Sequence, residues 1–405
     1  MKIIIIGAGP AGVSAAETVR SLDANAELLV FSAEPYPPYS PPAMVDHFLT
    51  GSDTHLWRGE DWPQRMDVDY RCGQAVTSVD PLARKISMPD GEQIGFDKLV
   101  IATGGRLYAP LDGASLPGVY NFKSLLAAEN LIRRVRSGEA RSALIVGAGF
   151  IGMEIALLLR DLGLQVTQIE MMEQVMPAML DADTAAIAQN IMLQRGIDLR
   201  LNTRALAFTG SKQADGLLLE SGERLQADLY VAATGVRPNL EFLEGSGVAH
   251  GWGIQVDDYL CTNNEHIYAA GDVIESKDRL TGERFVHPIF PNAVEQGHIV
   301  GLNLLGFQVP YAGADRMNSL KHLGLPIMVA GRKDGDEVYR VRRQNSLRSL
   351  YLEGDRLVGF QLVRDTRAAG ILRSLLNEGR DLHGWKDQLV DPNFSEGTLI
   401  SRAFT

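Results

Sequence analysis

Two glycine-rich segments carry the residue types and spacing that bind the pyrophosphate of a dinucleotide. Residues 7–12 read GAGPAG and residues 147–152 read GAGFIG. In such a turn the first glycine allows a tight bend, the second lets the backbone approach the pyrophosphate, and the third lets helix and strand pack closely. An acid follows each turn at the end of the next apolar run, Glu34 and Glu170, where a carboxylate can accept hydrogen bonds from an adenosine ribose.

The elements that must position these residues also occur twice. Each copy predicts a strand, a helix and a second strand, at 3–6, 11–22 and 26–34 in the first and at 143–146, 151–163 and 164–170 in the second. Each copy then passes through turn-rich strands to an ATG tripeptide, at 102–104 and 233–235. A helix that begins at the turn offers amide donors and the positive end of its dipole to phosphates. Because all these features agree twice, dinucleotide binding is favoured over glycines that serve packing alone.

Composition narrows the class of protein. The 405 residues have a net charge of −11 and a pI near 5.3, whereas a nucleic-acid-binding protein would more often be basic. The first apolar run is too short for a signal-peptide core, and no apolar stretch reaches the about 18 residues that a membrane span needs. The two cysteines, Cys72 and Cys261, make no disulfide framework, CxxC pair or four-cysteine zinc site. We therefore expect a cytoplasmic protein without a metal site, a membrane span or a nucleic-acid partner.

A third segment completes a recognisable set of motifs. Residues 267–273 read IYAAGDV, and HPIFPNAVEQGHIVGLNLLG at 287–306 predicts a helix from about Asn292. With these segments the chain resembles the pyridine nucleotide-disulfide oxidoreductases. These two-dinucleotide-binding-domain flavoproteins include glutathione-reductase-like enzymes, NADH oxidases, rubredoxin and ferredoxin reductases and the flavin part of NADH nitrite reductases. The resemblance runs from residue 1 to about 310 and continues more loosely to the end.

This resemblance implies an α/β fold with two Rossmann-like dinucleotide-binding domains and a small C-terminal α+β domain. The implied domains are an FAD-binding domain at 1–112 and 245–311, an NAD-binding domain at 113–244 and a C-terminal domain at 312–405. In the last, the pattern predicts strands within 317–331, at 337–343 and in a hairpin over 346–365, then a helix over 368–379. In relatives this domain covers the flavin side and can support a homodimer.

The resemblance assigns FAD to the first copy. The first turn would hold the pyrophosphate, Glu34 the adenosine ribose, the Val76 backbone the adenine, and Asp272 the ribityl or pyrophosphate region. The helix at Asn292 would direct its positive end to the N1–C2=O edge of the flavin, where negative charge develops. The implied FAD residues are Gly7, Gly9, Pro10, Ala11, Gly12, Glu34, Val76, Ala102, Thr103, Gly104, Arg106, Gly271, Asp272, Asn292 and Ala293.

The second copy is assigned to a nicotinamide nucleotide. Glu170 would accept hydrogen bonds from a 2′-hydroxyl and repel a 2′-phosphate, and no Arg or Lys lies between Gln168 and Leu180, so NADH is expected rather than NADPH. Glu154 matches a position near the flavin and the nicotinamide in relatives and could orient the nicotinamide amide; a plain helix-face glutamate is the alternative. The implied nucleotide residues are Gly147, Gly149, Phe150, Ile151, Gly152, Glu170 and Gly235.

The cysteines restrict where the electrons go. Relatives that reduce disulfides carry CxxxxC, CxxC or a single cysteine in the loop after the second strand; here no cysteine is in a motif position to supply the thiolate nucleophile. The sequence therefore predicts an NADH:acceptor oxidoreductase that passes electrons through flavin to a rubredoxin- or ferredoxin-like protein, or to a partner subunit of a larger complex. Two alternatives stay open: an NADH oxidase that reduces dioxygen, and an NADH-sensing flavoprotein, similar to apoptosis-inducing factor, that acts by protein interaction.

Two further segments invite an interpretation. The proline-rich run PYPPYSPPAMVD at 35–46 is expected to hold the flavin without reacting, while His287 and Phe290 could pack near the ring or serve the core. A basic segment could dock an acidic electron carrier or be a solvated strand face. Its residues are Arg332, Lys333, Arg340, Arg342, Arg343 and Arg348.

Overall fold

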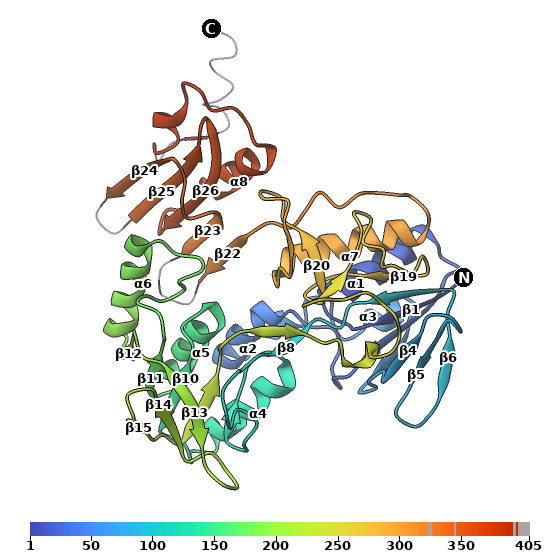
Figure 1. Ribbon diagram of the computed structural model, residues 1–405, viewed down its shortest axis with the longest axis horizontal. Helices are drawn as coiled ribbons and strands as arrows, with labels where there is room; N and C mark the ends of the chain where they lie inside the picture. Colours follow the sequence, from blue (N-terminus) through green and yellow to red (C-terminus); the bar gives the residue numbers. More distant parts are fainter. Residues whose placement is uncertain (322–323, 325, 344–345, 392–393, 396–405) are drawn as a thin grey trace. The chain divides into compact units, whose positions relative to one another are not determined.

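The computed structural model describes residues 1–321, 324, 326–343, 346–391 and 394–395. These residues divide into two units, each built on a parallel sheet (Figure 1). The first contains Met1–Tyr108, Lys123–Ala128 and Val236–Ala314, and the second contains Ala109–Phe122, Glu129–Gly235 and the described part of Asp315–Thr405. The C-terminal residues thus group with the second glycine turn, and the division into three domains stays a prediction.

The first unit is organised around a five-stranded parallel sheet in the order β19-β7-β1-β2-β3. Its central strand consists almost entirely of isoleucine, and Ile3, Ile4, Ile5 and Ile6 are each at most 5% exposed, as expected of a parallel strand that is covered on both faces. The strands are β1 (Lys2–Ile6), β2 (Glu27–Ser32), β3 (Asp69–Cys72), β7 (Lys98–Ile101) and β19 (Ile267–Ala269). The two strands predicted for the first copy are confirmed.

Two helices of this unit, α1 (Pro10–Leu22) and α7 (Phe290–Leu304), pack against each other (Figure 1). Two glycines of α7 make the contact possible. A Cβ on Gly297 would lie 2.1 Å from the Ala11 carbonyl oxygen, and one on Gly301 would lie 2.6 Å from the Thr18 Cβ. Larger residues would force the helices apart, so these glycines set the spacing between the first and the third motif.

The helix α7 begins earlier than the sequence predicts. Its first residue is Phe290, and Asn292 is already in the first turn. Pro291 is compatible with this start because proline is tolerated in the first turn of a helix, where its missing N–H has no intrahelical acceptor.

Smaller elements complete the first unit. The antiparallel strands β4 (Ser78–Asp80), β5 (Lys85–Ser87) and β6 (Gln93–Gly95) include the expected turn at Asp90-Gly91. Two further groups are the pair β8 (Gly105–Leu107) and β17 (Val236–Pro238), and the sheet of β18 (Ile254–Gln255), β20 (Ile274–Lys277) and β21 (Arg284–Phe285). The short helices are η1 (Pro41–Ala43), α2 (Met44–Thr50), η2 (Asp53–His55), α3 (Trp62–Arg65) and η3 (Glu241–Leu243).

The second unit repeats the parallel plan in the order β12-β11-β10-β16-β9. Its strands are β9 (Val119–Tyr120), β10 (Ser142–Val146), β11 (Gln165–Ile169), β12 (Asp198–Arg200) and β16 (Leu229–Ala232). The expected helix α5 (Phe150–Asp161) follows β10, and β13 (Ala205–Thr209), β14 (Gly216–Leu219) and β15 (Arg224–Leu225) form a small antiparallel sheet. Two helices were not predicted, α6 (Ala182–Gln194) and α4 (Leu125–Arg136), of which α4 begins in the first unit.

The C-terminal part of this unit is an antiparallel sheet in the order β22-β23-β26-β25-β24 with the helix α8 (Figure 1). Its elements are β22 (Met317–Leu320), β23 (Ile327–Gly331), β24 (Glu337–Arg343), β25 (Ser346–Glu353), β26 (Arg356–Val363), α8 (Ala369–Glu378) and η4 (Lys386–Gln388). The predicted strands, the hairpin at Gly354-Asp355 and the helix are confirmed. His322, Leu323 and Leu325 of the first predicted stretch lie outside the described residues. In the described part of the chain, no helix is both long and apolar enough to cross a bilayer.

Candidate dinucleotide sites

The first glycine turn has the conformation that a pyrophosphate site requires. Gly7 has a φ of +112°, and its amide donates to the Phe31 carbonyl oxygen at 2.8 Å. A Cβ on Gly7 would lie 2.1 Å from the Ala102 carbonyl oxygen, and one on Gly12 would lie 1.9 Å from the Gly7 carbonyl oxygen. Only glycine fits at both positions, because these backbone atoms cannot move away.

Gly9 differs from the other two glycines, since a Cβ there would meet no protein atom within 4 Å. This open side of the turn is where a pyrophosphate would approach the backbone. Pro10 and Ala11 begin α1 directly after it, so the first amides of the helix point to the same place. The residues of the turn therefore fit the pyrophosphate of FAD.

Glu34 is held by two segments, one that follows it directly and one 92 residues further along the chain. Its Oε2 accepts from the Tyr39 hydroxyl at 2.7 Å and its Oε1 from the Leu126 amide at 3.2 Å. Burial and the neighbouring carboxylate raise the pKa of Tyr39, so the phenol stays protonated and donates. The proline-rich run thus supplies the residue that orients the acid, and the carboxylate keeps acceptor capacity for a ribose hydroxyl.

The third motif joins this turn through Gly271. A Cβ on Gly271, at φ +87°, would lie 3.1 Å from the Ala11 Cβ and 3.8 Å from the Ala293 Cβ, so the segment passes between the first turns of α1 and α7. The next residue, Asp272, pairs with Lys123 at 2.9 Å. Lys123 was not predicted, because nothing in its local sequence marks a residue that pairs with an acid 149 positions away.

A buried polar network supports the same segment. The Gly271 amide donates to Gln296 Oε1 at 2.8 Å, and Gln296 Nε2 donates to Ser276 Oγ at 3.3 Å. Ser276 Oγ lies 3.2 Å from His287 Nδ1, and His287 Nε2 lies 3.3 Å from Asp278 Oδ2. His287 is 5% exposed and Asp278 is fully buried, so His287 serves the interior, as one of the two interpretations expected.

The remaining predicted FAD residues lie on the same unit. Thr103 Oγ1 donates to the Asn239 carbonyl oxygen at 3.1 Å, and the Gly104 carbonyl oxygen accepts from the Asn239 amide at 3.0 Å. The Arg106 guanidinium pairs with Glu241, so its contact with FAD stays a prediction. So does the contact of the Val76 backbone with adenine. Phe290, Asn292 and Ala293 belong to the first turn of α7, and the Phe290 ring packs edge-on against Trp57 at 5.2 Å between centroids.

The second glycine turn repeats the geometry of the first. Gly147 has a φ of +104°, and a Cβ there would lie 2.5 Å from the Ala233 carbonyl oxygen. A Cβ on Gly152 would lie 2.2 Å from the Gly147 carbonyl oxygen, whereas Gly149 again faces open space. This turn therefore fits a second pyrophosphate by the same criterion.

Glu170 is 8% exposed and is fixed by two backbone amides. Its Oε2 accepts from Ala148 at 2.8 Å and its Oε1 from Met172 at 3.0 Å. Arg200, on the neighbouring strand β12, is directed to Asp198 and Glu223, each at 3.1 Å. Arg200 is therefore engaged with acids, while Glu170 presents a fixed carboxylate.

The other predicted nucleotide residues are placed as follows. Phe150 and Glu154 are partly buried on α5, and Ile151 is 37% exposed. Gly235 has a φ of +142° and meets no atom within 4 Å of an added Cβ. Their contacts with the nucleotide, and the role of Glu154 in orienting a nicotinamide, stay predictions.

Both cysteines are free, and neither occupies a position where relatives carry a redox cysteine. Cys72 is exposed at the end of β3. Cys261 lies 3.6 Å from the Asn264 and 3.8 Å from the Ile267 carbonyl oxygen, and burial raises the pKa of its thiol. A raised pKa keeps the thiol protonated and therefore unreactive.

The basic segment is largely engaged within the second unit. Arg332 pairs with Asp334 and Glu353, Lys333 donates to the Pro177 carbonyl oxygen, Arg340 pairs with Asp181 and Asp183, and Arg342 lies 3.8 Å from Asp183. Arg348 is 6% exposed and donates to the Leu389 and Asp391 carbonyl oxygens. Arg348, which is buried, fits neither a docking surface nor a solvated strand face, whereas Arg340 is exposed but paired with two acids. No local pattern indicated that Asp181 and Asp183, at the start of α6, pair with Arg340.

Comparison with known proteins agrees with this geometry. A rubredoxin-NAD(+) reductase of Ectopseudomonas oleovorans is 29% identical over 92% of this chain and 98% of its own length, and an NADH oxidase of Methanocaldococcus jannaschii is 28% identical over 91% and 89%. The solved ferredoxin reductase for the CYP199A2 system of Rhodopseudomonas palustris superposes with a TM-score of 0.89 at 26% identity, over 98% of this chain and 99% of that one. A longer relative, the assimilatory nitrate reductase electron transfer subunit of Bacillus subtilis, is spanned over 51% of its length.

These relatives and a family model together settle the class of protein. They confirm the expected α/β fold with Rossmann-like dinucleotide-binding domains, the oxidoreductase class and the use of FAD with a nicotinamide nucleotide. The family model for pyridine nucleotide-disulphide oxidoreductases matches residues 1–297. The chain belongs to the pyridine nucleotide-disulphide oxidoreductase family.

Proposed function

We propose that this protein takes electrons from NADH and delivers them, through FAD, to a small redox protein of the rubredoxin or ferredoxin kind or to a partner subunit. One observation carries the proposal: both dinucleotide turns are intact, while neither of the two free cysteines occupies a position where relatives carry a redox cysteine. The disulfide chemistry that gives the family its name therefore lacks its nucleophile. FAD, when bound, accepts a hydride and can pass electrons on singly or in pairs.

The residues of the chain would bind FAD and NADH, orient them and stabilise the charge that develops on the flavin. The turn at Gly7–Gly12 and the first amides of α1 would hold the FAD pyrophosphate, with Glu34 at the adenosine ribose. The first turn of α7 would face the flavin ring and stabilise negative charge there by about 0.3–2 kcal/mol. The turn at Gly147–Gly152 and Glu170 would hold NADH in the same manner.

The carboxylate of Glu170 supports NADH as the reductant. Two backbone amides fix its orientation, so it cannot swing away from a 2′-phosphate. The negative charges of the carboxylate and of a 2′-phosphate would repel each other, and Arg200 is already paired with acids. NADPH would therefore bind more weakly than NADH.

An NADH oxidase is the second candidate, and the similarity to the enzyme from Methanocaldococcus jannaschii favours it. Steady-state NADH consumption separates the two. We expect slow consumption in air that rises several-fold when a rubredoxin or a ferredoxin is added. Consumption that depends on dioxygen and is unchanged by any carrier would favour the oxidase instead.

A further inference from the structure

The segment between β11 and α6, residues 171–180, encloses the second glycine turn. Glu170, directly before it, accepts from the Ala148 amide at 2.8 Å. Within it, the Met176 amide donates to the Ala148 carbonyl oxygen at 2.9 Å. Ala148 lies between the first two glycines of the turn, so Glu170 holds its amide and Met176 of the segment holds its carbonyl oxygen. The position of the segment therefore decides the position of the turn.

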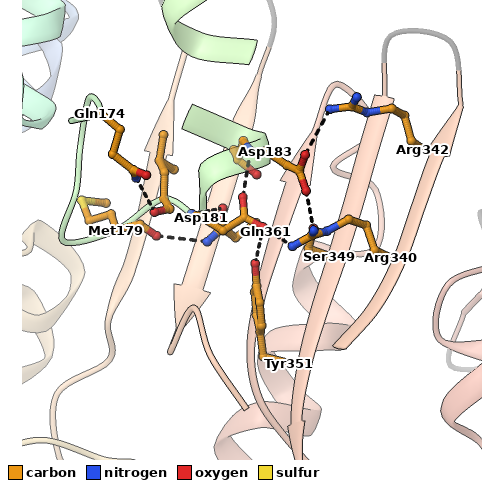
Figure 2. Close-up of polar contacts among 11 residues, drawn as sticks. Gln174, Met179, Asp181, Asp183, Arg340, Arg342, Ser349, Tyr351 and Gln361 are labelled. Carbon is orange, nitrogen blue, oxygen red and sulfur yellow. Dashed lines mark hydrogen bonds and ion pairs between the residues drawn. The ribbon is translucent and has the colours of Figure 1, made fainter. Parts of the chain in front are cut away.

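The far end of the same segment is held by the C-terminal sheet (Figure 2). Gln361 of β26 accepts from the Asp181 amide at 3.1 Å and donates to the Met179 carbonyl oxygen at 3.2 Å. Lys333, in the turn after β23, donates to the Pro177 carbonyl oxygen. Residues more than 150 positions away in the sequence thus take up two backbone groups of this segment and the Asp181 amide that follows it.

The first turn of α6 is fixed by the same sheet. Asp181 is the N-cap of α6, and its carboxylate accepts from the Thr184 amide at 2.8 Å, from the Tyr351 hydroxyl at 2.6 Å and from Arg340 at 2.5 Å. Arg340 also donates to Ser349 Oγ at 3.1 Å. Figure 2 shows these side chains converging on Asp181 from neighbouring strands.

A buried glutamine at the centre of this contact requires an explanation. Gln361 is 1% exposed, and Ser349, its partner in the register of β25 and β26, is fully buried. A buried amide destabilises a protein unless its groups are hydrogen-bonded. Gln361 directs its amide to the segment after β11, and both of its groups find partners there. The side-chain amide of Gln361 therefore hydrogen-bonds to the chain between β11 and α6.

We propose that Gln361 and Lys333 are positioning residues for NADH: the C-terminal sheet fixes the segment 171–180, and through it Glu170 and the second glycine turn, in the conformation that accepts the adenosine half of the nucleotide. This inference rests on the proposed use of NADH. A segment that is ordered before binding does not have to be ordered by the ligand, so affinity rises. Electron transfer at the nicotinamide end does not involve this segment. The C-terminal sheet thus sets KM rather than kcat.

The test compares Gln361→Met and Lys333→Met with the matched control Arg332→Met. Methionine keeps most of the volume and removes the hydrogen bonds; Lys333 is exposed, so its variant tests the inference even where the glutamine variant does not fold. Arg332 is adjacent but pairs with Asp334 and Glu353 of the sheet itself. Turnover is measured with ferricyanide as the acceptor, and the reductant is either NADH or reduced nicotinamide mononucleotide, which lacks the adenosine half.

We expect the KM for NADH to rise about fivefold to tenfold in the glutamine variant and about twofold to threefold in the lysine variant, in line with one or two lost hydrogen bonds. The kcat should stay within about twofold, and the KM for the mononucleotide should not change, because the segment does not reach that half. Arg332→Met should match the wild type. An unchanged KM for NADH in both variants, or an equal rise for both reductants, overturns the inference.

The test of Gln361 and Lys333 can fail without refuting the proposed function. Ferricyanide replaces the carrier protein, so a wrong carrier leaves this measurement intact. Wild-type protein that does not oxidise NADH with ferricyanide would refute the proposed function itself. Wild-type turnover with unaltered variants would refute only the role of Gln361 and Lys333.

Discussion

The Glu170 carboxylate accepts a hydrogen bond from the Ala148 amide at 2.8 Å. The carboxylate that is predicted to bind the ribose therefore also holds the backbone of the glycine turn. Its second oxygen accepts from the Met172 amide at 3.0 Å, so the carboxylate has one fixed orientation. A carboxylate has about four acceptor sites, and those that remain are available to a ribose hydroxyl. One side chain thus orders the turn and selects the nucleotide.

Replacing Glu170 with Gln should weaken NADH binding and reduce the preference over NADPH. The amide NH₂ would face a backbone N–H, and the negative charge that repels a 2′-phosphate would be lost. We expect the KM for NADH to rise roughly tenfold, ~1.4 kcal/mol, and the ratio of kcat/KM for NADH to that for NADPH to fall. Glu173→Gln, which changes an exposed acid in the same segment, is the control and should leave both values unchanged. A Glu170→Gln variant with an unaltered ratio would show that the carboxylate does not select the nucleotide.

Two glycines of the first turn should respond differently to alanine. A Cβ on Gly12 would lie 1.9 Å from a carbonyl oxygen, so Gly12→Ala should destabilise the FAD-free protein by about 1–3 kcal/mol. A Cβ on Gly9 meets no protein atom within 4 Å, so Gly9→Ala should change that stability by at most about 1 kcal/mol but weaken FAD binding. Thermal unfolding of the FAD-free proteins and a titration with FAD measure the two effects. Equal loss of stability in both variants would mean that Gly9 serves packing rather than the pyrophosphate.

Asp181 should make the second unit sensitive to acid. Burial opposes its charge, but hydrogen bonds from Tyr351 and Thr184 and the charge of Arg340 lower its pKa below the ordinary 3.8. A lowered pKa adds stability above the unfolded-state value, and this stability is lost as the pH falls through the folded-state value. Asp181→Asn keeps the helix cap but removes the charge, so it should cost about 1–3 kcal/mol at pH 7.

The difference between wild type and Asp181→Asn should stay constant from about pH 7 to pH 5 and shrink below about pH 4. Thermal unfolding across this range follows it. Asp336→Asn, which changes an exposed acid near the same sheet, should show a small difference that does not depend on pH in this way. A gap for Asp181→Asn that is as wide at pH 3.5 as at pH 7 would contradict the assignment.

Both cysteines should be dispensable. The double variant Cys72→Ser, Cys261→Ser should oxidise NADH with ferricyanide at a rate within about twofold of the wild type, because neither thiol has the surroundings of a nucleophile. In the wild type, a thiol reagent should modify exposed Cys72 quickly and Cys261 slowly, since burial raises the pKa of Cys261. Loss of turnover in either single variant would bring disulfide chemistry back into consideration.

Local patterns predicted the parts of the fold whose causes are local. The glycine turns could be found because the reasons for Gly7, Gly12, Gly147 and Gly152 lie in the strand and helix that flank them, and the C-terminal hairpin could be found because its alternation and its turn residues are contiguous. The helix α4 was missed, as it belongs to neither copy's repeated pattern.

Pairs that join distant segments could not be predicted in this way. Lys123 meets Asp272 across 149 residues, and Gln361 meets the Asp181 amide across 180. No spacing rule connects such residues, since only the folded chain brings them together. For the same reason the pairing of Arg340, an exposed residue of β24, with Asp181 and Asp183 was not predicted.

Rapid mixing under anaerobic conditions tests the central claim most directly. The protein, loaded with FAD, is mixed with one equivalent of NADH until the visible absorbance of the flavin is bleached, and is then mixed with rubredoxin, with ferredoxin or with air-saturated buffer. We predict that bleaching is fast and that at least one carrier protein restores the absorbance much faster than dioxygen does. Recovery that is fast in air and is not accelerated by any carrier would contradict the account.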